Sequence, residues 1–241
     1  MNLFGTTGGL AYHYKAWRYR QQLWDSHRQG TSAWLKSWQP HSRHLVLIGP
    51  SAGYSLPRAF LEQFDRLTAT DPDILSSRLF QVRFKGLTVN WARQNYFSQK
   101  QGLLWPEGLF HLREEHPDAA FLFCNFLGQL PLLSRHFDSQ RESWLKHWQI
   151  FQQNSEWASF HDLWSTDQGL PPASLWANAS PDLAASARHF VPADFKGTVR
   201  DHMTRDLFRD SCPRAQWLWH LTPNQTHCIE GVRPSKQDMG I

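Results

Sequence analysis

The segment Gly49-Pro-Ser-Ala-Gly53 contains the first residues of this sequence whose types and spacing could carry chemistry. It follows the apolar run of residues 45–48 and precedes Pro57, a residue typical of the first turn of a helix. A glycine-rich turn between a strand and a helix lets the backbone approach a ligand closely. The spacing Gly-x-Ser-x-Gly is also that of the nucleophile elbow of serine hydrolases, so the segment supports two different functions.

The hydrolase interpretation makes Ser51 the nucleophile. The helix signals Ser55 and Pro57 come late for it, because an elbow serine needs a helix that starts at once and supports the oxyanion site. An order of serine, acid and histidine is available in Ser51, Asp162 and either His202 or His227. With 13 histidines in the chain such an order is easily met by chance, so serine hydrolysis is the third of our hypotheses.

The cofactor interpretation is supported by an acidic residue further along the chain. Asp71 comes directly after the run of residues 67–70, about 20 residues beyond the glycine turn. At the end of a second strand, a carboxylate in this place accepts hydrogen bonds from ribose hydroxyls. The turn has no third glycine of a dinucleotide-binding motif and no Gly-Lys-Ser/Thr of a phosphate-binding loop, so neither motif is present.

Polar side chains also follow two later apolar runs. Asn125 comes directly after the run AAFLFC, and His161-Asp162 comes directly after WASF. Ligands of an open parallel sheet bind outside the carboxyl ends of its strands, so these residues are expected at the site. We expect Asn125 to orient a substrate amine or hydroxyl and His161 to accept a proton from it. Without a function, the two would be a residue that caps a turn and a hydrogen-bonded histidine.

A second pair of an acid and a histidine, Asp201-His202, raises the question of a metal ion. Together the two pairs offer two carboxylates and two imidazoles. Adjacent residues point in different directions, however, and no H-x-x-x-H or C-x-x-C spacing accompanies them. We therefore predict no metal site and place Asp162 and His202 among the residues that contact substrate. His227 and Cys228 alternate along an expected strand and are assigned no role.

Short apolar runs alternate with helix-like segments through most of the chain, which indicates a parallel sheet covered on both faces. Strands are expected at residues 45–48, 66–70, 87–90, 119–124 and 157–160, and helices at residues 56–64, 74–84, 106–115 and 141–152. We expect Ser55 to cap the first of these helices. Residues 216–221 and 226–232, joined by Thr-Pro-Asn-Gln, are expected to form an antiparallel hairpin.

The N-terminal region is expected to be helical. Residues 9–38 carry aromatic side chains at roughly helical spacing, and Gly30 is expected to separate two helices. Pro40 ends the pattern. We therefore predict a helical extension or lid at residues 1–40 and a main domain at residues 41–241.

In these features the sequence resembles the class I S-adenosylmethionine-dependent methyltransferases. The resemblance covers roughly residues 44–232 and rests on four stretches, HLVLIGPSAGY, RLTATDPD, AAFLFCNFLG and QWLWHLTPNQTHCIEGV. It implies a doubly wound α/β fold, with a mostly parallel sheet that ends in an antiparallel hairpin. It also implies transfer of the sulfonium methyl group to a nucleophile by in-line displacement, in which positioning supplies most of the catalysis.

The resemblance assigns the parts of the cofactor S-adenosylmethionine to residues of this chain. The ribose would be held by Asp71, and the adenine would lie beside Asn90 and Trp91. The methionine part would lie over the glycine turn, which consists of Gly49, Pro50, Ser51, Ala52 and Gly53.

The resemblance also bears on the substrate. N-terminal appendages of this family often form a substrate lid, so Tyr12 and His13 would close over the cofactor. The alternative is that Tyr12 and Trp17 only fix their helix on the sheet. The branch that methylates nucleic-acid amino groups carries Asn-Pro-Pro-aromatic where this chain has Asn125-Phe-Leu-Gly, so that substrate class does not carry over. A non-catalytic binding or scaffold protein with the same fold is the second hypothesis.

Charge and composition restrict the partners and the compartment. The net charge is +4, from 25 basic and 21 acidic residues without a basic run, so a small-molecule acceptor is preferred and RNA is the second choice. Three cysteines without C-x-x-C spacing suit a reducing compartment. We expect a cytoplasmic protein without a membrane partner, because neither a signal peptide nor an apolar run of about 18 residues is present. The oligomeric state is not predicted.

Overall fold

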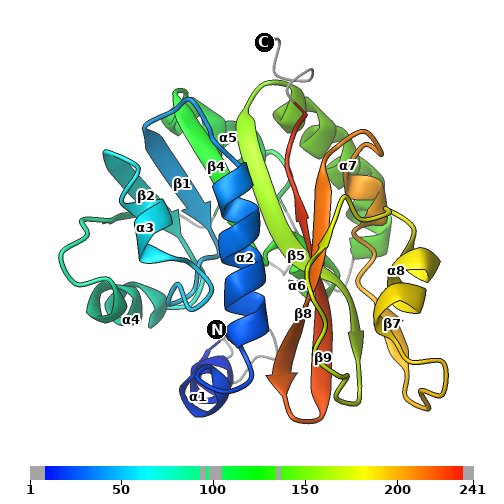
Figure 1. The fold of residues 1–241 in the computed structure, drawn as a ribbon. Helices are drawn as coiled ribbons and strands as arrows, with labels where there is room; N and C mark the ends of the chain where they lie inside the picture. Colours follow the sequence, from blue (N-terminus) through cyan, green and yellow to red (C-terminus); the bar gives the residue numbers. More distant parts are fainter. Residues whose placement is uncertain (1–8, 93–95, 98–104, 134–136, 236–241) are drawn as a thin grey trace.

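One mixed sheet runs through the protein, and the described residues place nine strands in it (Figure 1). The computed structural model describes residues 9–92, 96–97, 105–133 and 137–235. The strands are β1 His44–Ile48, β2 Arg66–Thr70, β3 Asn90–Trp91, β4 Ala119–Cys124, β5 Glu156–Thr166, β6 Trp176–Ala177, β7 Val199–Asp201, β8 Arg214–Thr222 and β9 Gln225–Val232.

The strand order shows how the sheet is wound. It is β3-β2-β1-β4-β5-β9-β8-β6, with β7 paired to β5. Strand β1 pairs in parallel with both β2 and β4, so the order reverses between β1 and β4. Strand β4 is parallel to β5, whereas β9 is antiparallel to both β5 and β8. The prediction of a doubly wound, mostly parallel α/β sheet that ends in an antiparallel hairpin is confirmed.

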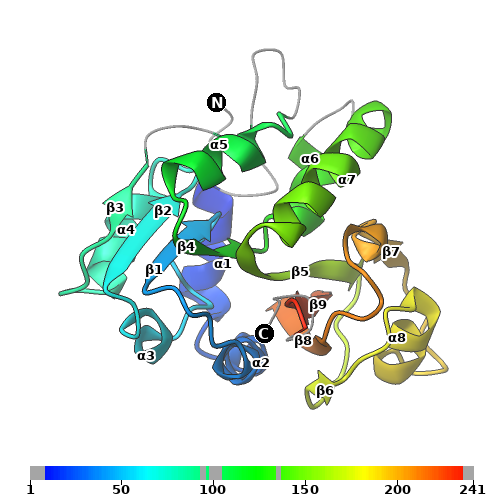
Figure 2. The same ribbon diagram turned by 90° about the horizontal axis from the view of Figure 1, so that it is seen from above.

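Helices cover both faces of the sheet. They are α1 Leu10–Tyr19, α2 Asp25–Ser37, α3 Arg58–Leu61, α4 Ser76–Arg83, α5 Gly108–Glu115, α6 Leu130–Leu133, α7 Phe137–Gln153 and α8 Leu183–Phe190. Figure 2 shows α2 and α3 on one face and α5 and α7 on the other. None of the helices in the described ranges combines the length and the apolar character that crossing a bilayer requires.

The central strands are apolar on both sides because both faces are covered. All five residues of β1 and all six of β4 are buried. Leu45 and Leu47 of β1 belong to the core beneath α2, whereas Val46 and Ile48 belong to the core beneath α7. This alternation is what a strand buried between two helical layers requires.

Helix α2 contains Gly30, which was expected to separate two helices. The prediction was wrong: the chain leaves the helical conformation at residues 20–24 instead, between α1 and α2. A Cβ atom at Gly30 would lie 2.4 Å from Cγ of Trp217 in β8. The glycine is therefore required by the close approach of the helix to the sheet, and it does not mark a break.

Strand β5 is longer than the sequence predicts. It continues beyond Phe160 to Thr166, so that His161 and Asp162 lie inside the strand and not directly after it. Its first half pairs in parallel with β4, and its second half pairs with β9 and β7. The polar residues continue the strand because these two antiparallel partners, remote in the chain, supply their hydrogen bonds.

The helix after the glycine turn is shorter than expected and starts differently. Helix α3 covers four residues, and Pro57 occupies the N-cap position without a side-chain cap. The expectation that Ser55 caps this helix was wrong. Its Oγ lies 2.6 Å from Nε2 of His27 in α2, so that Ser55 connects the turn to the helix above it.

Candidate active site

The glycine turn lies at the carboxyl end of β1 and has an unusual backbone. Gly49, Ser51 and Gly53 have φ angles of 67°, 49° and 66°. The left-handed conformation is strained for a serine, so the surrounding structure must hold it. The N–H of Gly49 donates to the carbonyl of Thr70 at 2.9 Å, and the N–H of Ser51 donates to Oδ2 of Asp71 at 2.7 Å. The end of β2 therefore fixes the shape of the turn.

Asp71 is half-buried at the end of β2, as the sequence places it. Its Oδ1 accepts the N–H of Asp73 at 2.8 Å, and its Oδ2 accepts that of Ser51. Burial raises the pKa of Asp71 to about 6, although both N–H groups lower it. Each carboxylate oxygen has a second lone pair, so Asp71 holds the turn and can still accept two hydroxyl groups.

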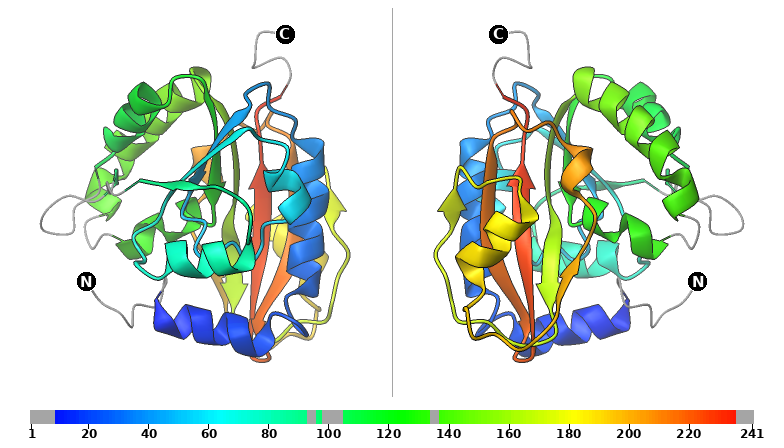
Figure 3. Two further views of the ribbon diagram at one scale, coloured as in Figure 1. Left: turned by 90° about the vertical axis from the view of Figure 1, so that its left-hand side faces the viewer. Right: turned by 90° about the vertical axis from the view of Figure 1, so that its right-hand side faces the viewer.

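Helix α1 lies across the end of the sheet at which β1 and β2 finish (Figure 3). Nε2 of His13 lies 2.8 Å from Oδ2 of Asp73, and its Nδ1 lies 3.0 Å from the hydroxyl of Tyr54. The N–H of Gly9 donates to the same oxygen of Asp73 at 3.1 Å. These contacts hold α1 beside the glycine turn and Asp71.

Tyr12 of α1 lies among aromatic side chains beside the glycine turn. Its ring packs at 5.8 Å from the rings of both Trp24 and Tyr54. Burial raises the pKa of Tyr12 well above its usual value, and the neighbouring Tyr54, Asp162 and Asp71 raise it further. The tyrosine therefore lies near Asp71 at the end of β2 and near Asp162 within β5, where a ligand of the glycine turn would extend.

Asn125 follows β4 with a φ angle of 51°, and both polar atoms of its side-chain amide form hydrogen bonds with Asp162. Its Nδ2 donates to Oδ2 of Asp162 at 3.2 Å, and its Oδ1 accepts the N–H of Asp162 at 2.9 Å. The backbone N–H of Asn125 donates to the carbonyl of Phe160 at 2.7 Å. In this arrangement Asn125 orients Asp162.

His161 lies on the opposite face of β5 from Asp162 and is fully buried. Its Nδ1 lies 3.0 Å from Oγ of Ser159, and its Nε2 lies 3.6 Å from a carboxylate oxygen of Glu230. Its ring stacks on Phe208 at 5.0 Å. These contacts place His161 in the core beneath α7, away from the side chains that surround Asp162.

Two further histidines, His202 and His227, lie close to Asp162. Nδ1 of His227 in β9 lies 2.9 Å from Oδ1 of Asp162. His202, which follows β7, lies with Nε2 3.0 Å from Oγ of Ser165 and Nδ1 3.3 Å from the carbonyl of Gly128. The side chains of Asp162, His202 and His227 are all buried. His202 was among the predicted site residues, whereas His227 was assigned no role.

The edge strand β3 holds the two residues expected beside adenine. Asn90 is exposed, and Trp91 is half-buried with its ring 5.6 Å from that of Phe80. Phe80 also faces Gly53, since a Cβ atom at this glycine would lie 2.8 Å from the Phe80 ring. Trp91 and the glycine turn therefore contact the same side chain of α4.

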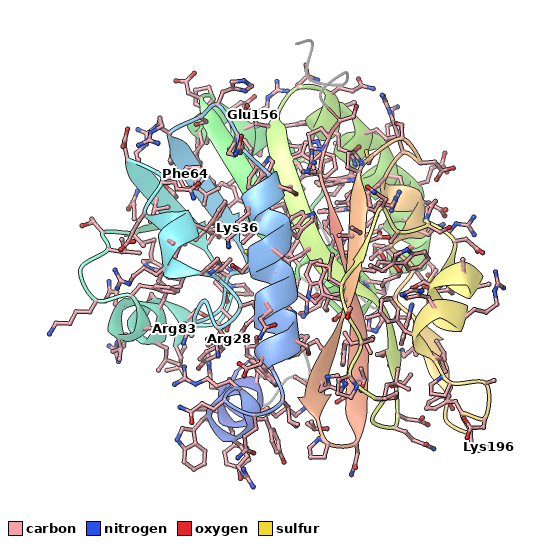
Figure 4. The ribbon with its side chains drawn as sticks, viewed as in Figure 1. Arg28, Lys36, Phe64, Arg83, Glu156 and Lys196 are labelled. Carbon is pink, nitrogen blue, oxygen red and sulfur yellow. The ribbon has the colours of Figure 1, made fainter. Side chains whose placement is uncertain are left out.

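A groove of about 800 Å³ lies on the outer side of the glycine turn, between α2 and α3. Figure 4 shows Arg28 and Lys36 along α2, with Arg83 of α4 near Arg28. The guanidinium of Arg83 donates to the carbonyl of Gly53 at 3.1 Å, so the groove adjoins the turn. Its lining residues are Asp25, Arg28, Gln29, Ser32, Ala33, Lys36, Ser55, Leu56, Pro57, Arg58, Arg83 and Phe84.

No family model matches the sequence, and no curated protein matches it. The solved structures that it resembles include S-adenosylmethionine-dependent methyltransferases. The N-methyltransferase NodS from Bradyrhizobium japonicum WM9 is 12% identical with a TM-score of 0.43, and the match covers 87% of this chain and 86% of that one. A methyltransferase from Anabaena variabilis ATCC 29413 is 12% identical with a TM-score of 0.45, covering 92% and 94%. Function is therefore inferred from the residues of this chain.

Proposed function

We propose that the protein is an S-adenosylmethionine-dependent methyltransferase. The observation that carries this proposal is the geometry at the reversal of the strand order. There the glycine turn after β1 is held in a left-handed backbone by Asp71 at the end of β2. Ligands of doubly wound sheets bind in the crevice at such a reversal.

Different residues around the crevice would contact the methionine, ribose and adenine parts of the cofactor. The open backbone of the glycine turn would lie under the methionine part, and the free lone pairs of Asp71 would accept the ribose hydroxyls. Trp91 at the edge of the sheet offers an apolar surface to adenine. The sulfonium methyl would then face Asp162 and Tyr12, on the side where β4 and β5 end.

The acceptor would enter between α1, the end of β4 and Asp162 in the middle of β5. Helix α1 is tied to Asp73 through His13 and Gly9, and it covers this side of the sheet. A covered site favours a small-molecule acceptor, which Tyr12 and Asp162 would position for in-line displacement. RNA is the second acceptor class, and the basic groove beside the glycine turn is the observation that favours it.

Serine hydrolysis finds no support at Ser51. Its Oγ is buried and has no hydrogen-bond partner among the described residues, so no histidine activates it there. The scaffold hypothesis differs from the methyltransferase hypothesis in one property, the binding of cofactor. Binding of S-adenosylhomocysteine, the product form of the cofactor, therefore separates the two.

The test is isothermal titration of the protein with S-adenosylhomocysteine. We expect micromolar binding that weakens by about tenfold or more in Asp71→Asn, because hydrogen bonds to a charged acceptor contribute more than those to an amide. Asp65→Asn is the matched control, since Asp65 is an exposed acid directly before β2. A folded protein that binds no S-adenosylhomocysteine would exclude the proposal.

A further inference from the structure

Three buried side chains from three parts of the chain meet beside the candidate active site. They are Asp162 in β5, His202 after β7 and His227 in β9, and one ligand atom from each lies within 4.8 Å of the others. We propose that these three residues bind a divalent transition-metal ion of the zinc type. This revises our prediction from the sequence that the protein has no metal site.

The composition of the cluster suits such an ion. Two imidazoles and one carboxylate form a ligand set for Zn²⁺ and for related divalent ions that act in catalysis. The sequence points to a different set, because it pairs His161 with Asp162 and Asp201 with His202. In the structure His161 faces the other core and Asp201 is exposed, and His227 from the terminal hairpin completes the cluster.

The neighbours of the cluster hold its members as the outer partners of a metal site do. The Nδ1 of His202 faces the carbonyl of Gly128 at 3.3 Å, which leaves the lone pair on Nε2. The Ser165 hydroxyl lies 3.0 Å from that nitrogen, and an ion bound there would displace it. Metal-binding histidines commonly donate their second N–H to a carbonyl in this way. The amide of Asn125 fixes Asp162, through both a side-chain and a backbone hydrogen bond.

His227 is the member whose partners are incomplete. It is 8% exposed, and its Nε2 is buried without a hydrogen-bond partner among the described residues. The contact of its Nδ1 with Asp162 is to another member of the cluster. No other element of the described structure therefore holds the His227 ring by a hydrogen bond, and the ring is free to ligate an ion.

The negative charge of the buried Asp162 carboxylate is a further reason to expect a cation at this site. Asp162 is 3% exposed, and no Lys or Arg forms an ion pair with it in the described part of the chain. The partners of its carboxylate are the Asn125 amide and the His227 ring. A buried carboxylate is costly unless a positive charge or several hydrogen bonds compensate it. A divalent cation between Asp162 and the two imidazoles would supply that charge.

The position of the ion suggests what it does, and this step rests on the proposed methyltransferase function. Three protein ligands leave at least one coordination position open, near Tyr12 and the expected sulfonium methyl. An acceptor hydroxyl bound there would lose its proton to water more readily. Its oxygen would form the new bond to the methyl carbon as the carbon–sulfur bond breaks, and neutral S-adenosylhomocysteine would leave. The acceptor class is therefore a hydroxyl compound.

The test is metal binding by the untagged chain of 241 residues after treatment with a chelator. We expect isothermal titration with Zn²⁺ to give one ion per chain, and Co²⁺ to give a visible absorption spectrum of nitrogen and oxygen ligands. His202→Gln and His227→Gln should each weaken binding by at least about tenfold. His220→Gln should bind as the wild type does, because His220 lies on β8 with its Nε2 2.9 Å from the carbonyl of Leu170, outside the cluster.

Two results would overturn the inference. One is a folded wild-type chain that binds Zn²⁺ no better than His202→Gln, and the other is a Co²⁺ spectrum that is the same in both. A glutamine variant that is unfolded by circular dichroism cannot serve in this comparison. In that case the wild type decides, and a folded wild type without a Co²⁺ spectrum overturns the inference. Titration of the same samples with S-adenosylhomocysteine separates the two proposals, because His202 and His227, the substituted residues of the metal cluster, are not among the residues that would hold the cofactor.

Discussion

At the scale of single residues, Asp71 combines two tasks. It holds the strained turn through the N–H of Ser51, and it offers the remaining lone pairs of its carboxylate to a ligand. The first task explains why the turn can keep a serine in a left-handed conformation. The second makes the charge of this carboxylate important for binding.

The charge of Asp71 predicts a dependence of binding on pH. Burial raises the pKa of this carboxyl to about 6 in the free protein. Below that pH the proton must leave before ribose hydroxyls can be accepted, so the dissociation constant of S-adenosylhomocysteine should rise by roughly tenfold for each pH unit. Above that pH the affinity should be constant. Isothermal titration between pH 5 and about pH 8 measures this effect.

Two variants assign the dependence to Asp71. Asp71→Asn should bind weakly at every pH, without the loss of affinity at low pH. His13→Gln removes the titratable partner of the neighbouring Asp73, and Tyr12 and Tyr54 stay neutral in this range since burial raises the pKa of both. A low-pH loss of affinity that disappears in His13→Gln and persists in Asp71→Asn would contradict the assignment.

Among the helices and strands, α2 packs closely on the sheet because glycines stand at the contact. Trp34 and Trp217 pack together with ring centroids 6.2 Å apart, and Gly231 of β9 faces the Trp34 ring. Gly30 lies against Trp217 from the helix side. Glycines on both the helix and the sheet thus leave room for two large indole rings.

The contact at Gly30 predicts the cost of adding one methyl group. Gly30→Ala gains about 1 kcal/mol of helix propensity but places its Cβ against Trp217. Overpacking of this kind costs about 1–3 kcal/mol, so the free energy of unfolding should fall. Urea denaturation measures the change. The control Gln29→Ala, at an exposed position of the same helix, should change it by less than about 0.5 kcal/mol; an equal or higher stability of Gly30→Ala would contradict the explanation.

At the scale of the whole molecule, positive charge gathers beside the glycine turn. The groove beside this turn is lined by four basic residues and one acidic residue. The basic residues are Arg28, Lys36, Arg58 and Arg83, and the acidic residue is Asp25. Arg28 forms an ion pair with Asp25 of the same helix, and Arg58 forms one with Glu62 directly after α3, so Lys36 and Arg83 carry the remaining positive charge of the groove. The net charge of +4 therefore has a local concentration close to the candidate active site.

This concentration of charge predicts where RNA would bind if RNA is the acceptor. Affinity for a fluorescent single-stranded oligonucleotide, measured by anisotropy at low salt, should fall by about tenfold or more in the double variant Arg28→Glu/Lys36→Glu. Lys196→Glu is the control with the same type of change, because Figure 4 shows Lys196 at the far end of the molecule. Equal losses in the two variants would contradict a role for the groove, and weak binding by the wild type would favour the small-molecule acceptor.

The local parts of this protein can be predicted from short stretches of the amino-acid sequence. The strands β1 and β4 are recognisable because burial on both faces requires unbroken apolar runs. The glycine turn and Asp71 are recognisable because the residue types that permit a tight turn, and the acid after a short strand, are properties of short stretches. The terminal hairpin is also visible, from two alternating runs joined by a short turn.

Which histidines lie close to Asp162 depends on how distant strands pair. His227 reaches Asp162 because β9 pairs with the second half of β5, with a shift in register between Asp162 and Trp164. Which face His161 takes depends on the same pairing, since one residue of register exchanges the two faces of a strand. Such pairings are set by hydrogen bonds and packing between segments far apart in the chain, and no pattern within either segment records them.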